Sequence, residues 1–318
     1  MTSSSGRIRR RILGISPGET TFARRGFRGG DAEVRRHLER IGGIFLQGYH
    51  AALEEDGPEA LVLRLDAVES AFRGFAYEGS AMGLALIDQL TPWRRGRLRW
   101  LLDGRCSGHI YMIHVGVGWV LGRLRLRVGR FLARLDPVLR WLALDGYGFH
   151  EGYFHWPRSV ARRAIPGRLS GYARRAFDQG LGRSLWFVEG ADVVRIPSSI
   201  AAFTSSRQAD LWGGVGLACA YAGGVDRAAI ERLRAAAGPY RAQLAQGAAF
   251  AAKARQRADN SAEHTALACE ILCGLSADEA ARVTDEALDD LPPDGAIPAY
   301  EVWRRRIQAR WAEEVVTS

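Results

Sequence analysis

The chain has 318 residues, and 47% of them are hydrophobic, enough to bury a sizeable core and too many for a disordered protein. Its formal net charge is +9, but Lys253 is the only lysine and arginine carries all the other basic charge. We attribute this excess to the base composition of the gene. Since no basic stripe carries interleaved aromatic residues, we expect no nucleic-acid partner.

The first 20 residues contain an arginine cluster, and the short apolar stretch after it, residues 12–16, runs directly into Pro17 and Gly18. An export signal would need an apolar stretch of about 7 to 15 residues at this point, so we interpret residues 1–20 as a flexible arm. The longest apolar runs, residues 109–122 and 211–225, are shorter than the roughly 20 residues of a membrane-spanning helix. We therefore predict core helices and no transmembrane segment.

Several segments show the spacing of amphipathic helices. Asp56 and Gly57 before Pro58 indicate a helix start, and apolar residues at three- and four-residue steps predict one helix over residues 120–135. Ser276 and Glu279 form the pattern of a capping box. The same helical spacing recurs in residues 226–238, 276–288 and 300–311. Only residues 60–65 and 184–196 could be strands, so we predict an all-α or strongly helix-dominated fold.

The sequence also contains an internal similarity at a separation of about 130 residues. The matching segments occur in the same order: 45–53 with 177–185, 71–86 with 202–220, 116–125 with 247–256, and 144–153 with 272–281. We predict a tandem duplication packed into one globule. Its parts are the arm 1–20, a helical repeat 21–157, a second repeat 158–292 and a C-terminal helix 293–318.

The alignment gives a specific interpretation of the segment DGYGFHEGYF, residues 145–154. Its counterpart contains Gly274 and the capping box, so we expect a joint between two helices, with Gly146 ending one and Glu151 capping the next. His150 would take the place of Asp278.

Glycines within the predicted helices need an explanation, because each costs roughly 0.5 to 1 kcal/mol relative to alanine. They form three groups: Gly79 and Gly83, Gly116 and Gly118, and Gly213, Gly214 and Gly216. Close approach between helices is the simpler explanation. A ligand lying against exposed helix backbone is the alternative.

Acidic residues beside aromatic residues and glycines are the candidates for chemistry. An aromatic segment followed by Glu-Gly occurs at Glu78, Glu151 and Glu189, and Asp210 falls near the place in the second repeat that Glu78 holds in the first. Burial would raise the proton affinity of such carboxylates and suit them to general acid or base catalysis. Arg73 and Arg207 precede Glu78 and Asp210 at matching places, so structural ion pairs are the alternative.

The catalytic candidates are Glu78, Asp210, Glu151 and His150. The predicted ligand pocket comprises Tyr77, Gly79, Met82, His114, Trp119, Trp212 and Gly213. His150 and His155 lack the four-residue spacing of the HExxH pattern, so we expect no metal site. There is no P-loop and no strand-linked GxGxxG, so we expect no cofactor.

Four cysteines, at positions 106, 219, 269 and 273, are too few and too irregularly spaced for a disulfide framework. Cys269 and Cys273 share one helical face as thiols, and no CxxC pair is present. We predict a reducing, cytoplasmic location.

The run AFDQGLGRSLWFVEGADVVRIPSSIAAFTSSRQADLWGGVGLACAYAGG, residues 176–224, together with FAYEGSAMGLALID and QGAAFAAKAR, resembles the bacterial domain-of-unknown-function family numbered 1702. The resemblance extends from about Leu13 to Trp311. This family is often met in actinobacterial gene clusters for enediynes and other highly unsaturated polyketides. The resemblance implies a cytoplasmic accessory protein that acts on or holds a long unsaturated chain, and it carries over no catalytic residue.

Two functional hypotheses follow. The first is an accessory enzyme, such as a cofactor-independent cyclase, isomerase or lyase, that applies acid–base chemistry to a long hydrophobic chain in an apolar helical pocket. The second is a non-catalytic binding protein or chaperone for the same substrate, with pathway enzymes as further partners. Two or more unpaired carboxylates in the pocket would favour the enzyme, and the oligomeric state stays open.

Overall fold

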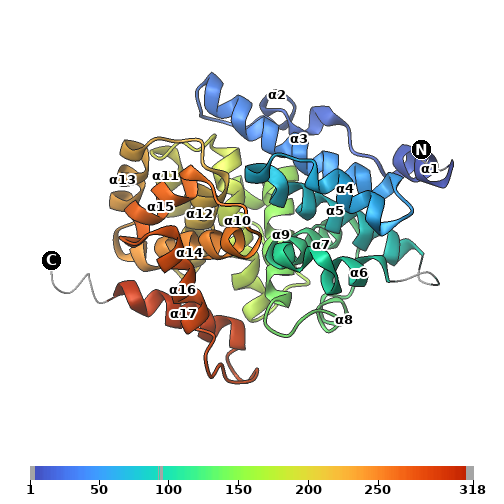
Figure 1. The fold of residues 1–318 in the computed structure, drawn as a ribbon. Coiled ribbons are helices and arrows are strands. Elements are labelled where there is room, and N and C mark those ends of the chain that lie inside the picture. The colour runs from blue at the N-terminus through green and yellow to red at the C-terminus, as the bar shows by residue number, and fades with distance from the viewer. Residues whose placement is uncertain (1–3, 92, 94–95, 313–318) are drawn as a thin grey trace.

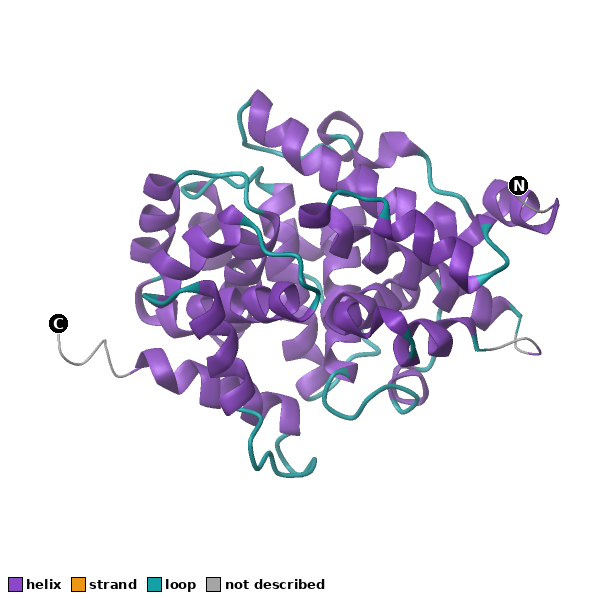
Figure 2. Cartoon of the chain, viewed as in Figure 1, coloured by secondary structure: helices purple, strands orange, loops and turns teal. Residues whose placement is uncertain are grey.

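The computed structural model describes residues 4–91, 93 and 96–312, and it contains helices joined by loops, with no strand in this part of the chain (Figure 2). This confirms the predicted all-α fold. Of the two segments considered as strands, residues 60–65 lie in helix α4. Residues 184–196 form the end of helix α10, a turn and the start of the next helix. The helices are α1 Ser4–Leu13, α2 Phe22–Arg25, α3 Ala32–Glu54, α4 Pro58–Asp66, α5 Ser70–Leu90, α6 Arg97–Asp103, α7 Ile110–Arg123, α8 Val128–Leu132, α9 Arg140–Phe154, α10 Tyr172–Val188, α11 Arg195–Ala201, α12 Ser205–Ala222, α13 Arg227–Ala236, α14 Arg241–Arg257, α15 Glu263–Cys273, α16 Ala277–Glu286 and α17 Ala299–Ala312. Short helical turns are η1 Pro17–Thr20, η3 Arg105–His109, η4 Pro157–Ala161 and η5 Gly238–Tyr240.

The centre of the fold is a series of seven helices in which each packs against the next: α3, α5, α7, α9, α10, α12 and α14. Figure 1 shows the series crossing the molecule, with α3 and α5 near one end, α9 and α10 in the middle, and α12 and α14 towards the other end. Helix α14 then packs against α15, α16 and α17. The described residues include no helix that is both long and apolar enough to cross a membrane.

Glycine pairs make this series possible. Successive residues of an α-helix are separated by about 100°, so two glycines in a Gly-x-Gly pattern face opposite sides of the helix. In α9, a β-carbon on Gly146 would lie 1.9 Å from the carbonyl oxygen of Val115 in α7. A β-carbon on Gly148 would lie 1.9 Å from the carbonyl oxygen of Phe177 in α10. The backbone of α9 thus contacts the backbones of its two neighbours, α7 and α10.

The same arrangement recurs in other members of the series. The Gly-x-Gly pairs are Gly116 and Gly118 in α7, Gly146 and Gly148 in α9, Gly180 and Gly182 in α10, and Gly214 and Gly216 in α12. Close helix approach is therefore the reason for most of the glycines singled out in the sequence. Gly213 differs, because its nearest side-chain atom is Nη2 of Arg304, 3.4 Å from the position of a β-carbon.

Three sequence-based expectations differ from the structure. Residues 145–154 form no joint, because Gly146 lies in the interior of α9 and Glu151 lies in its last turn rather than at a helix start. The helix predicted over residues 120–135 is interrupted after Arg123 and resumes at Val128 as α8. Part of the segment expected as a loose arm is helix α1, from which the carbonyl group of Leu13 accepts a hydrogen bond from Tyr49 at 2.7 Å.

The capping box of Ser276 and Glu279 at the start of α16 is confirmed, as is the left-handed Gly274 that ends α15. The duplication stays a prediction. In its favour, helix contacts follow the order α3, α5, α7, α9 in one half and α10, α12, α14, α16 in the other. Against a simple correspondence, Gly83 faces the preceding helix α3, whereas its aligned partner Gly216 faces the following helix α14.

Helix α3 offers a matched pair of glycines to test the packing. A β-carbon on Gly48 would lie 1.9 Å from the carbonyl oxygen of Ala76, while nothing lies within 4 Å of one on Gly43. We expect Gly48→Ala to lower the free energy of unfolding by about 3 kcal/mol, because two helix backbones must separate. Gly43→Ala should raise it by about 0.5 to 1 kcal/mol. Urea denaturation measures both, and equal effects would contradict this account of the glycines.

Candidate functional site

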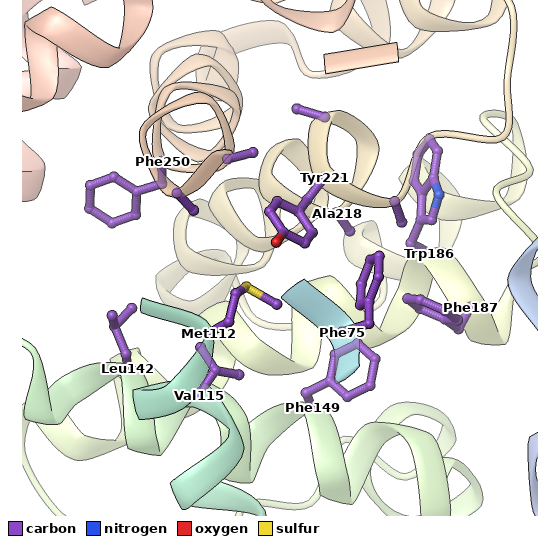
Figure 3. Packing of buried hydrophobic residues seen from close by; sticks show 14 of the residues in the cluster. Phe75, Met112, Val115, Leu142, Phe149, Trp186, Phe187, Ala218, Tyr221 and Phe250 are labelled. Atoms are coloured by element: carbon purple, nitrogen blue, oxygen red, sulfur yellow. The ribbon is translucent and has the colours of Figure 1, made fainter. Parts of the chain in front are cut away.

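An apolar pocket with a cavity volume of about 40 Å³ lies between helices α3, α5, α7, α9, α10 and α12, and part of it is open to solvent. This volume holds only a few water molecules, so the side chains of the walls must move apart to admit a larger ligand. Aromatic side chains supply a large part of the wall; they are Phe45, Phe75, Trp119, Phe149, Tyr153, Phe154, Phe187 and Tyr221. The partly exposed Glu19, Thr20 and Phe154 mark the open end, where turn η1 approaches α3 and α9. Figure 3 shows Phe75, Phe149 and Phe187 gathered in this part of the core.

Glu78 is the acidic residue on the inner wall of this pocket, and its side chain is almost fully buried. The indole Nε1 of Trp119 donates a hydrogen bond to Oε1 of Glu78 at 3.0 Å. In the described part of the chain, no residue donates a hydrogen bond to the other oxygen, Oε2. Burial raises the pKa of Glu78 to about 7, although Arg183 and the Trp119 hydrogen bond act in the opposite direction.

Arg183 is the cation nearest to Glu78, and it is shared between two acids. Its Nη2 lies 3.9 Å from Oε1 of Glu78, while its Nη1 makes a short, direct ion pair with Asp145. Asp145 also accepts a hydrogen bond from Gln179 at 2.9 Å. Because Asp145 holds the guanidinium more closely, the charge of Arg183 compensates Glu78 only in part. Glu78 can therefore bind and release a proton near neutral pH.

Asp210 lies outside the pocket and is held by two arginines. Arg175 donates two hydrogen bonds to its carboxylate, at 2.9 and 3.1 Å, and Arg304 donates a third at 2.8 Å. Arg175 and Arg304 both also contact Glu301, so the cluster connects α10, α12 and α17. This arrangement is a structural ion-pair network, and it occupies the hydrogen-bonding capacity that a proton-transfer role would require.

The arginines expected as partners of the acids have other roles. Arg207 pairs with Asp178, and Arg73 donates to the backbone carbonyl groups of Asp66 and Val68. The sequence therefore anticipated a buried ion pair for Asp210 but placed it with the wrong arginine.

His150 and Glu151 lie together in the last turn of α9, behind the pocket wall. Nδ1 of His150 is 3.2 Å from Oε1 of Glu151, and the His150 ring meets the Trp119 ring edge-on. Burial lowers the pKa of His150. Burial raises the pKa of Glu151, but the hydrogen bond with His150 and the charges of His150, His155 and Arg158 together outweigh burial and leave this pKa lowered. Neither residue lines the pocket.

Within the part of the chain that the structure describes, these two residues and His155 form the cluster that could hold a metal ion. One donor atom from each lies within 4.8 Å of the others, because α9 ends at Phe154 and His155 departs from helical geometry. The helical spacing that argued against a metal therefore does not apply. Positive charges from Arg123, near His150, and Arg158, near Glu151, oppose a cation at this place.

Of the residues predicted to form the ligand pocket, Trp119 lines it. The others predicted with it, Tyr77, Gly79, Met82, His114, Trp212 and Gly213, do not. Tyr77 donates a hydrogen bond to Asp66 at 2.8 Å and stacks on His109. His114 lines a separate surface groove beside α8. Sequence reasoning missed Arg183, whose one signal was its place directly after the Gly180-x-Gly182 pair.

Removing the charge of Asp210 would leave Arg304, which is fully buried, without its closest carboxylate. We expect Asp210→Asn to lower the free energy of unfolding by about 3 to 5 kcal/mol. Glu69→Gln is the control, because the Arg40–Glu69 pair is more than half exposed and should leave the urea midpoint nearly unchanged. An unchanged midpoint for Asp210→Asn would contradict the structural role of the network.

Comparisons with known proteins place the chain in a family. The model of the family described as "Protein of unknown function (DUF1702)" matches residues 4–311. Neither the curated proteins nor the solved structures gave a match. Because the matched region spans nearly the whole chain, this protein belongs to the DUF1702 family.

Proposed function

We propose that this protein is an accessory enzyme of natural-product biosynthesis that binds a long, hydrophobic, unsaturated chain in the pocket and uses Glu78 as its acid–base group. One observation carries the proposal: a buried carboxyl group with a pKa near 7 lies on the wall of a narrow, aromatic pocket. A narrow apolar pocket suits a thin, flat chain once its side chains move apart, and a carboxyl group of this pKa holds and releases protons at physiological pH.

The geometry supports proton transfer to a carbon–carbon double bond. The O–H bond of protonated Glu78 breaks, its proton forms a new C–H bond with the electron pair of the double bond, and a carbocation results. The aromatic rings that line the pocket, Trp119 and Phe45 among them, can stabilise positive charge by cation–π interaction. Arg183, at 3.9 Å, stabilises the carboxylate that remains. Return of a different proton to Glu78 completes an isomerisation. In a cyclisation, the electron pair of a second double bond first closes the ring, and the carbocation that this leaves on the second double bond then loses a proton to Glu78.

The pathway context rests on the resemblance described above, which points to highly unsaturated, enediyne-like polyketides. Within the described chain all four cysteines are free and buried, which is compatible with the reducing cytoplasm we propose as the location. The chemistry needs no cofactor, because proton transfer uses only Glu78 and the substrate.

The alternative is a carrier that holds the same chain without changing it. One observation favours it: of the four predicted acid–base candidates, only Glu78 lines the pocket, while Asp210 is ion-paired elsewhere. Two unpaired carboxylates in the pocket would have favoured an enzyme over a carrier. An enzyme would release the bound chain in a chemically altered form, whereas a carrier would release it unchanged.

Glu78→Gln separates these functions, because glutamine keeps the size of the side chain and can accept the Trp119 hydrogen bond but cannot donate a carboxyl proton. We expect co-expression with a polyene-producing synthase to yield altered extracted products, with conversion reduced at least roughly a hundredfold. Binding of a fluorescent conjugated polyene should change little.

The control for this experiment is Glu151→Gln, which removes a buried acid outside the pocket and should leave the products unchanged. Identical products from the unchanged protein and Glu78→Gln would exclude Glu78 as the catalyst for that chain and favour the carrier.

The raised pKa of Glu78 also predicts a pH dependence of stability. The folded protein holds this proton more tightly than the unfolded chain, whose carboxyl group has its ordinary pKa of 4.5. Below about pH 4.5 Glu78 therefore does not lower the free energy of unfolding. As the pH rises from there to about 7, Glu78 lowers this free energy by an amount that grows to about 3 kcal/mol. We expect the free energy of unfolding of Glu78→Gln, measured relative to that of the unchanged protein, to increase as the pH rises through this range. A difference independent of pH would contradict the assignment.

A further inference from the structure

A second apolar pocket adjoins the first along α10 and α12. It has a cavity volume of about 30 Å³, part of it open to solvent, and lies between α7, α9, α10, α12, α14 and α17. Met112, Val115, Leu142 and Phe250 form much of its wall. The polar side chains of Tyr111 and Lys253 are partly exposed and mark its outer end, between α7 and α14.

The two pockets share part of their walls. Arg183, Leu217 and Tyr221 line both. Figure 3 shows Tyr221 between the two groups, with Phe75, Phe149 and Phe187 on one side and Met112, Val115, Leu142 and Phe250 on the other. These three residues therefore form a junction between two small apolar spaces.

The hydroxyl group of Tyr221 is placed unusually at this junction. It is buried and has no partner at regular hydrogen-bonding geometry among the described residues, and the one group near enough to lower its pKa by hydrogen bonding is Asn260. It fits there because residue 74 is glycine: a β-carbon at Gly74 would lie 1.9 Å from the hydroxyl oxygen and 3.4 Å from Cγ of Met112. Burial raises the pKa of Tyr221, against the opposing effects of Arg255 and Asn260, so the hydroxyl group keeps its proton. A buried donor without an acceptor opposes folding, which asks for a functional reason.

The ring of Tyr221 has a fixed position, as has Arg183, which pairs with Asp145, while Leu217 at the junction and Met112 beside it can move. The Arg255 guanidinium lies 4.3 Å from the ring centroid, and its Nη2 donates to the backbone carbonyl group of Tyr221 at 2.7 Å. Leu217 is only partly buried, and Met112 is unbranched and flexible. Displacement of these two side chains would join the pockets while leaving the tyrosine in place.

From these observations we infer that the two pockets are the two arms of one channel. An extended chain occupies both arms, and the Tyr221 hydroxyl group donates a hydrogen bond to an oxygen atom partway along that chain. The occupant is thus a long, mostly hydrocarbon chain with a carbonyl or ether oxygen away from its ends. This inference rests on the proposed function, because it takes the first pocket to be the chain-binding site that contains Glu78.

Two alanines allow the arms to be blocked separately. Ala218 lines only the first pocket and Ala251 only the second. Displacement of the fluorescent tetraene cis-parinaric acid by decanoic acid and by octadecanoic acid measures short- and long-chain binding. We expect Ala251→Leu to weaken binding of octadecanoic acid about tenfold, because the end of the chain loses its place, and to leave decanoic acid unaffected. Ala218→Leu should weaken both.

Melting temperatures show whether the leucine variants are folded, and Ala254→Val, a smaller change in the second pocket, replaces Ala251→Leu if that variant is not. Equal loss of short- and long-chain binding in Ala251→Leu, or no loss, would overturn the single channel and leave the proposed function standing. Failure of every chain to bind the unchanged protein would overturn both.

Tyr221→Phe tests the hydroxyl group in the same assay. Removal of an unpaired donor should leave the melting temperature unchanged or higher, while a mid-chain keto derivative of octadecanoic acid should bind about tenfold more weakly and octadecanoic acid itself as before. A lower melting temperature with equal binding of both acids would show that the hydroxyl group serves the fold, through Asn260, and would overturn its role in binding.

Discussion

Contact between helix backbones is the constraint on which the rest of this structure depends. Four successive helices of the central series carry Gly-x-Gly, and the two glycines of each pair admit a neighbouring backbone on opposite sides. Where backbones touch, side chains have no room. The large residues must therefore point above or below the line of contacts, and it is there that the aromatic walls of the two pockets form.

The same close packing explains the buried charges. Asp145 and Arg183 lie next to the contact between α9 and α10, since a β-carbon on Gly180 would be 1.7 Å from the Asp145 carbonyl oxygen. Water is excluded from such a contact, and a buried ion pair without water contributes little to stability. A second acid, Glu78, shares the same cation at 3.9 Å. One arginine cannot fully balance the negative charge of two carboxylates. The carboxylate whose charge is only partly balanced is Glu78, on the pocket wall.

The sequence was a good guide to helices and to the reason for their glycines, because both depend on local spacing. It failed at Gly146, since a glycine that ends a helix and a glycine that admits a neighbouring backbone look the same in one sequence. Alignment with Gly274, a true helix end, led to the wrong choice. It also could not find Arg183 as the partner of Glu78, because these residues are 105 positions apart and meet only through the order in which the helices pack. Local patterns carry no record of that order.

Pocket occupancy and the proton on Glu78 must influence each other. A hydrocarbon chain in the first pocket would displace water from the side of the carboxyl group that faces it, and loss of water raises the pKa of a buried acid further. The limit is set by Arg183, which Asp145 and the packing of α9 and α10 hold at a fixed distance. A bound chain therefore favours the protonated form of Glu78 when a double bond lies beside it. After the proton is transferred, the same arginine stabilises the carboxylate, so one fixed cation serves both stages of the proposed reaction.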